Sequence, residues 1–143
     1  MGYDIHIHRR ADWTDVGDDI TSDEWRAVYE ADESLTIYGA YGYREGENVR
    51  ETPVIGWPAP DCAEAAFTLY RGGIRTKNPS ASAIRKAWEI ADKLGAKVQG
   101  DDGEFYSADG KNCYYEPGDN ELPVEMEAPA RSEQKWWRKL FNK

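Results

Sequence analysis

The segment from Asn78 to Gly95, NPSASAIRKAWEIADKLG, most constrains the fold, because it carries the start, the apolar stripe and the stop of one helix. Asn78 is a suitable N-cap, and Pro79 suits the first helical position. Apolar side chains recur at helical spacing over residues 84–94, and Gly95 provides a C-cap. An amphipathic helix of this kind packs its stripe on another element, and the surrounding sequence predicts a sheet.

Strand-like patterns lie on both sides of this helix. In YDIHIH, residues 3–8, apolar side chains occupy the odd positions, and Asp4, His6 and His8 occupy the even ones. This alternation is typical of a half-buried strand. Further strands and hairpins are expected at 35–49, 54–60, 65–78 and 96–107. Glycine-containing turns separate the arms of the last two hairpins.

A second helix is expected near the N-terminus. Thr21 and Glu24 form a capping box, and the apolar residues that follow them continue a helix to about residues 31–34. The resulting order is strand, helix, four strands, helix, two strands. It predicts an α+β fold with a mainly antiparallel sheet, two helices packed on one face, and a short C-terminal amphipathic helix.

The chain length of 143 residues fits a single domain. We expect one α+β domain over 1–116, an acidic proline-containing linker over 117–130, and a basic aromatic helix over 131–143. That last helix could fold back on the domain, dock on a partner or lie on an anionic membrane, and the membrane is the least favoured of the three.

Charge and cysteine content restrict the partners and the compartment. The net charge of -9 disfavours nucleic acid and favours a basic protein partner. Cys62 and Cys113 are too far apart in sequence for a zinc motif, and we expect both to be reduced. There is no apolar run of about 20 residues and no signal-like start, so a cytoplasmic location is expected.

The only two histidines form an H-x-H pair, His6 and His8. Such a pair on a first strand resembles the zinc ligands of metal-dependent amidohydrolases, but those enzymes need a barrel of roughly 250 residues. No third histidine is present, and the acidic loop at 12–24 does not match an EF-hand. The sequence therefore predicts no catalytic residue, no cofactor and no metal ligand, and it favours a protein that is not an enzyme.

One stretch has the composition of a recognition surface. Residues 37–57 are rich in tyrosine, glycine and tryptophan, which supply contact area at low entropic cost. The same tyrosines could instead pack one face of the sheet. Acidic side chains elsewhere could steer a basic partner. The candidate partner-binding residues are Asp18, Asp19, Tyr38, Tyr41, Tyr43, Trp57, Asp101 and Asp102.

The segments MGYDIHIHRRADW and NPSASAIRKAWEIADKLGAKVQGDDGEFYSADG resemble an uncharacterised family of small acidic bacterial proteins. These segments carry fold information and no catalytic signature, so the resemblance assigns no functional residues. In size and charge the chain is similar in style to the immunity proteins of bacterial toxin systems. The leading hypothesis is an immunity protein that binds and neutralises a basic toxin. The alternatives are a small carboxylate- or metal-dependent enzyme and a peripheral membrane adaptor.

Overall fold

The computed structural model describes residues 3–61, 64–115 and, for the backbone, 124–127. Within them the elements follow the order β-α-β-β-β-β-α-β-β-β-β. The elements are β1 (Asp4–His8), α1 (Ser22–Ala31), β2 (Thr36–Glu45), β3 (Asn48–Trp57), β4 (Ala65–Tyr70), β5 (Gly73–Lys77), α2 (Ala81–Leu94), β6 (Lys97–Gly100), β7 (Phe105–Tyr106), β8 (Asn112–Tyr115) and β9 (Val124–Glu127).

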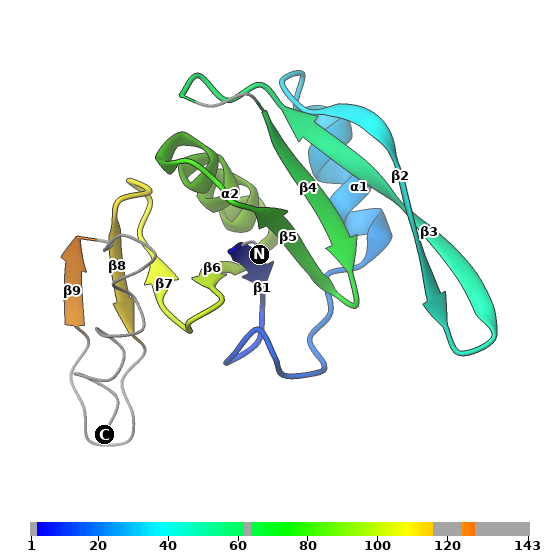
Figure 1. The fold of residues 1–143 in the computed structure, drawn as a ribbon, viewed down its shortest axis with the longest axis horizontal. Coiled ribbons are helices and arrows are strands. Elements are labelled where there is room, and N and C mark those ends of the chain that lie inside the picture. The colour runs from blue at the N-terminus through cyan, green and yellow to red at the C-terminus, as the bar shows by residue number, and fades with distance from the viewer. Residues whose placement is uncertain (1–2, 62–63, 116–123, 128–143) are drawn as a thin grey trace.

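The described strands form one nine-stranded sheet in the order β2-β3-β4-β5-β1-β6-β7-β8-β9 (Figure 1). Every neighbouring pair is antiparallel. The N-terminal strand β1 lies in the middle, where Ile7 is opposite Ile74 of β5 and Val98 of β6. The first strand in sequence order is therefore the central strand of the sheet.

Both helices cover the same face of this sheet (Figure 1). Trp25 of α1 and Ile90 of α2 belong to one buried cluster that also contains Ile5 of β1. Burying a large apolar side chain of this kind stabilises the fold by about 1.5–3 kcal/mol. The expected α+β architecture with two helices on one face of an antiparallel sheet is confirmed for the described residues.

The helix ends agree with the sequence analysis in two places and differ in one. The Thr21–Glu24 capping box is present, and Gly95 adopts the left-handed conformation at the end of α2. The N-cap of α2 is Ser80, however, not Asn78. The amide side chain of Asn78 is engaged elsewhere, because its Oδ1 accepts a hydrogen bond from the backbone N–H of Tyr3 at 3.0 Å.

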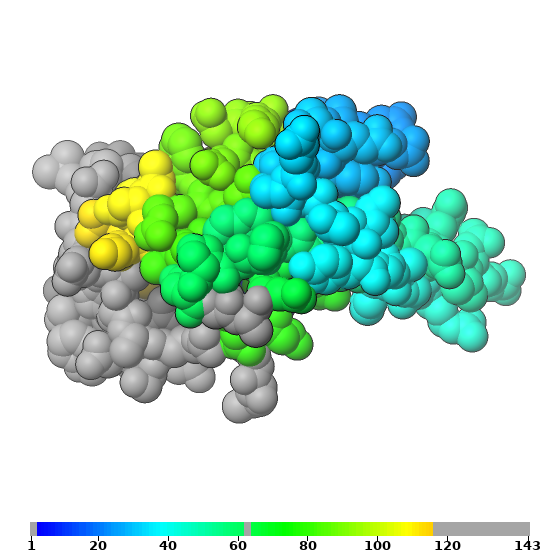
Figure 2. All heavy atoms as spheres, turned by 90° about the horizontal axis from the view of Figure 1, so that it is seen from above, coloured from blue at the N-terminus to red at the C-terminus, as the bar shows by residue number. Residues whose placement is uncertain are grey.

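The β2–β3 hairpin is longer than the sequence predicts. We expected a short strand at 54–60, whereas β3 begins at Asn48 and runs through Pro53. Strand β4 pairs with β3 only from Val54 onward, so Pro53 removes no hydrogen bond on that side. The outer half of the hairpin, residues 40–53, consequently has two strands only, and it projects from the end of the molecule (Figure 2).

The C-terminal region adds to the sheet. Strand β9 pairs with β8 and lies inside the interval 117–130, which the sequence predicts to be a linker. The expected basic aromatic helix at 131–143 lies outside the described residues. Among the helices that the structure describes, none is long and apolar enough to cross a membrane.

Candidate functional site

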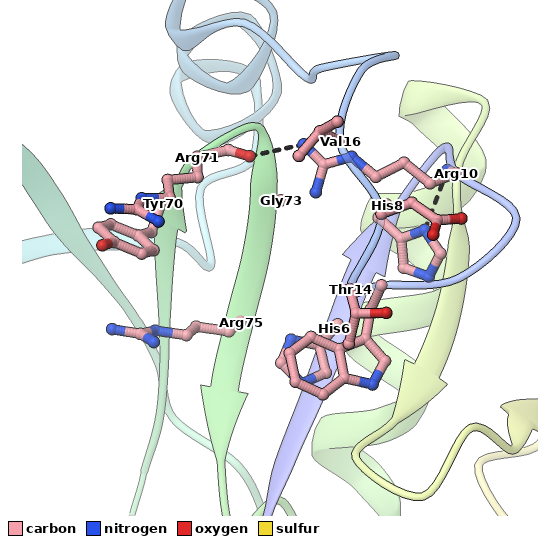
Figure 3. A pocket seen from close by; sticks show the side chains of 11 residues that line it. His6, His8, Arg10, Thr14, Val16, Tyr70, Arg71, Gly73 and Arg75 are labelled. Carbon is pink, nitrogen blue, oxygen red and sulfur yellow. Dashed lines mark hydrogen bonds between the residues drawn. The ribbon is translucent and has the colours of Figure 1, made fainter.

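The sheet face opposite the helices, here called the polar face, contains a pocket with a volume of about 400 Å³ (Figure 3). Alternation along β1 produces this face: Ile5 and Ile7 are buried beneath the helices, so His6 and His8 point the other way. The histidines are thus on one face of a strand, as the sequence predicts. We call the cavity the polar-face pocket.

The floor of the pocket is formed by β1 and β5. Gly73 of β5 lies beside His8, and its missing side chain leaves space between that histidine and Tyr70 of β4. His8 is buried, and this burial lowers the pKa of its imidazole, so the ring is neutral near pH 7. Its Nδ1 accepts a hydrogen bond from the backbone N–H of Arg10 at 3.0 Å.

One wall is the loop at residues 9–20, which Gln99 of β6 fastens to the sheet. The Gln99 side-chain oxygen accepts hydrogen bonds from His8 Nε2 at 2.7 Å and from the Trp13 backbone N–H at 2.8 Å. Its amide nitrogen donates to Asp12 at 2.9 Å. The indole of Trp13 stacks on His6, with ring centroids 4.0 Å apart. The loop is therefore held over the polar face by hydrogen bonds to Gln99, whose side chain is buried.

Arg10 fastens the same loop to the β4–β5 turn. Its guanidinium donates to the carbonyl oxygen of Gly17 at 2.7 Å, to Asp19 at 2.8 Å and to the carbonyl oxygen of Arg71 at 2.6 Å. Gly72 has a φ of 80°, and a side chain there would collide with Asp19 and Arg10. Glycine is thus required at this turn for two reasons.

The opposite wall is cationic and aromatic. Figure 3 shows the ring of Tyr70 between the guanidinium groups of Arg71 and Arg75. The distances from the guanidinium carbons to the ring centroid are 5.1 and 5.0 Å, respectively. Arg75 also lies 5.6 Å from the ring of Tyr41 on the hairpin. Both distances to Tyr70 are within the range of cation–π attraction.

Three potential metal ligands meet at the other end of β1. Ligand atoms of Asp4, His6 and Asp101 lie within 4.8 Å of one another, and Asp4 Oδ1 is buried without a hydrogen-bond partner. His8 does not join them, so the H-x-H pair is not a ligand pair here. Asp101 already accepts hydrogen bonds from His6 Nε2 at 2.7 Å and from the Asp4 backbone N–H at 2.9 Å. These hydrogen bonds account for its position without a metal.

The aromatic residues that the sequence predicts as partner contacts lie in different parts of the structure. Tyr41 and Tyr43 stack on each other and both pack edge-on against Tyr70, next to the pocket. Tyr38 instead covers Gly56 of β3. Trp57 is half-buried against the hydrophobic core. The tyrosines at 41 and 43 therefore do pack on one sheet face, yet Tyr41 stays exposed.

The predicted acidic residues are also divided. Asp19 and Asp101 are engaged by Arg10 and His6, respectively. Asp18 is exposed and has a φ of 47°. Asp102 lies half-buried in the β6–β7 turn, where its backbone N–H donates to the hydroxyl of Tyr3 at 3.4 Å.

Cysteine chemistry finds no support in the described residues. Cys113 is a free, buried thiol, and burial raises its pKa to about 12. A thiol with such a pKa is protonated at neutral pH and is a poor nucleophile. Cys62 lies outside the described residues.

The sequence analysis missed the residues that define the pocket: Arg10, Trp13, Tyr70, Arg71, Gly73, Arg75 and Gln99. The positions of two of these residues could have been predicted from the sequence. In GIRTK, alternation places Gly73 and Arg75 on the face opposite Ile74, and that is the polar face. No local pattern indicates that the 9–20 loop would lie above them.

Comparisons with protein-family models, with curated proteins and with solved structures found no match to this chain. The function therefore has to be argued from the residues and geometry described above.

Proposed function

We propose that this protein is a protein-binding module whose contact surface is the projecting β2–β3 hairpin. The observation that carries the proposal is the exposure of large apolar side chains there: Ile37, Tyr41 and Val49 are 61, 39 and 71 % exposed. Tyr41 and Val49 belong to the projecting part of the hairpin, and large exposed apolar side chains on such an element are typical of an interaction site.

The backbone of the hairpin supports the same proposal. β2 is the edge strand of the sheet as described, and it is ten residues long. An exposed edge strand presents unpaired N–H and C=O groups, which a partner strand can pair with. A two-stranded ribbon is only marginally stable alone. Packing of Tyr41 and Tyr43 against Tyr70 anchors this one to the body of the molecule.

Charge favours a basic partner. At a net charge of -9, the protein attracts a cationic protein over long range and accelerates their encounter. Exposed acids such as Asp18 would contribute to this steering. Within this proposal the partner is a toxin domain and the protein is its immunity protein, which acts in the cytoplasm of the producing cell. The supporting features are the acidic charge and the exposed arm.

Affinity capture with matched variants tests the proposal. The tagged full-length protein, a Val49→Asp variant and a Val16→Asp variant are each used to capture proteins from the native host. Val16 is 93 % exposed in the 9–20 loop, so it receives the same substitution away from the hairpin. We expect one stoichiometric basic protein with the wild type and with Val16→Asp. Capture by Val49→Asp should fall at least about tenfold, because a charge would be placed in an apolar contact.

A further variant, Tyr41→Ala, should weaken capture in the same way. Equal capture by the wild type, Val49→Asp and Tyr41→Ala would remove the hairpin from the contact, and the absence of any stoichiometric partner would overturn the binding proposal itself. The immunity step is tested separately, by asking whether co-expression of the protein restores growth to cells that express the captured partner.

A further inference from the structure

We propose that the polar-face pocket binds a small organic anion whose carboxylate or phosphate groups are held by Arg71 and Arg75, one on each side of the Tyr70 ring. The lining of this site belongs to β1, the 9–20 loop, β4, β5 and the turn between them, and the site requires no protein partner. Its volume of about 400 Å³ is within the range of small-molecule sites, which run from roughly 300 to 1,000 Å³.

The first reason concerns the groups that the two arginine side chains contact. Within residues 3–61 and 64–115, neither guanidinium forms an ion pair with a carboxylate. Their guanidinium groups lie against the rings of Tyr70 and Tyr41. The chain has nine more acidic than basic residues, so acids were abundant enough to neutralise them. Tyrosine rings instead orient the cations and leave their N–H groups for an anion.

The second argument is the charge of the whole lining. Arg71 and Arg75 contribute two positive charges and Asp15 one negative charge, while the charge of Arg10 is offset by its ion pair with Asp19. The Asp15 carboxylate accepts a hydrogen bond from the backbone N–H of Asp12 at 3.1 Å, so it takes part in the turn of its own loop. An otherwise acidic molecule thus has a local excess of positive charge where the surface is hollowed.

The third reason is that several features of the fold hold the cavity open. Three features contribute to this. Gly73 has no side chain that would fill the floor, Gln99 hydrogen-bonds to the 9–20 loop, and Arg10 joins that loop to the β4–β5 turn. Neutral His8 closes the floor and adds no charge of its own. A preformed polar cavity with rigid walls lowers the entropic cost of binding a small ligand.

Gly73 also offers a specific test. A Cβ placed there meets Ile7 O at 3.6 Å and His8 Cβ at 4.0 Å, which are ordinary contacts, and its φ is not positive. Valine suits a strand, so Gly73→Val should fold and fill the floor of the pocket. Arg75→Gln removes one cation. Arg26→Gln, on the exposed side of α1, is the matched control for loss of an arginine.

The experiment is a titration followed by ¹H–¹⁵N NMR, with three probes: inorganic phosphate, citrate and adenosine 5′-monophosphate. Sodium chloride at matched ionic strength is the blank. We expect saturable shifts of the amides of Gly73, Arg75 and Thr14 with at least one probe. The affinity should fall about tenfold in Arg75→Gln, vanish in Gly73→Val and stay unchanged in Arg26→Gln. Comparison of citrate with the two phosphate probes identifies which anionic group is preferred.

Two results would overturn the inference. The first is the absence of saturable shifts with all three probes. The second is binding of equal strength in Gly73→Val and the wild type, since a filled pocket cannot hold the same ligand. Thermal unfolding of each variant shows that it is folded before it is titrated.

Discussion

At the scale of single residues, Glu104 shows how burial sets a charge state. Its side chain is fully buried and accepts hydrogen bonds from the hydroxyls of Tyr106, at 2.8 Å, and Tyr3. Gly100 allows this arrangement, because any side chain there would collide with Glu104. Burial raises the pKa of Glu104, although both tyrosine hydroxyls stabilise its ionised form. This carboxyl group is part of the core and does not belong to the pocket lining described above.

The raised pKa of Glu104 predicts the pH dependence of stability. Because the folded-state pKa lies above the unfolded one, the folded protein binds more protons between the two values, and the free energy of unfolding falls as pH rises through that interval. Glu104→Gln cannot ionise and should lack this fall. Its stability relative to the wild type should therefore increase from pH 4 to pH 8.

Urea unfolding of both proteins across this pH range measures the difference. Glu33→Gln, at an exposed position, is the control, and its curve should run parallel to that of the wild type. Parallel curves for Glu104→Gln and the wild type would contradict the assignment of a raised pKa.

At the scale of elements, an ion pair joins the end of α1 to the middle of α2. Lys86 Nζ lies 2.6 Å from Asp32 Oδ2, and the two side chains are only 9 and 14 % exposed. Burial opposes ionisation of Asp32, but hydrogen bonds from Lys86 and Ser34 outweigh this effect and lower its pKa to about 2. The stability that this pair contributes is present above about pH 4 and is lost as pH falls through about 2.

Removing the lysine should loosen the contact between the helices. Lys86→Met leaves a half-buried carboxylate without its cation, and we expect a loss of about 2–3 kcal/mol at pH 7. Glu89→Gln is the matched control, because Glu89 lies 3.5 Å from the same Nζ but is 63 % exposed. Its effect should stay within about 0.5 kcal/mol. Chemical denaturation at pH 7 measures the loss of stability in both variants. Equal losses would show that the buried Lys86–Asp32 ion pair stabilises the protein no more than the exposed contact with Glu89 does.

At the scale of the whole molecule, the two faces of the sheet have different surroundings. The helices bury one face and create the core, while the polar face carries the pocket and continues into the hairpin through Tyr70 and Tyr41. The net charge of -9 acts on partners at longer range than either surface.

This charge predicts the kinetics of partner binding. If the captured partner is basic, the association rate should fall several-fold as ionic strength rises from about 0.01 to 0.15 M, because the Debye length shortens from about 30 to 8 Å. The dissociation rate should change much less, since the contact proposed for the hairpin is apolar. Stopped-flow mixing at several salt concentrations measures both rates. An association rate that does not respond to salt would mean that the partner is not selected by charge.

Local patterns explain which parts of the fold could be predicted. The Thr21–Glu24 capping box, the Gly95 cap and the alternation along residues 3–8 depend on neighbours within a few residues, and all three are present. The N-cap of α2 was predicted at Asn78, because nothing local shows that Tyr3, 75 positions away, engages that side chain. The length of β3 was underestimated, because whether a proline is tolerated depends on which strand lies beside it.

The sequence by itself determined the two helices, the polar character of the β1 face and the acidic charge, because these follow from periodicity, capping and composition. Only the tertiary structure decided that the 9–20 loop covers this face and that Arg71 and Arg75 stand across from it. Hydrogen bonds between residues 61 to 91 positions apart hold this arrangement. Contacts between residues so far apart in the chain depend on which strands the fold places side by side, and no short stretch of sequence encodes them.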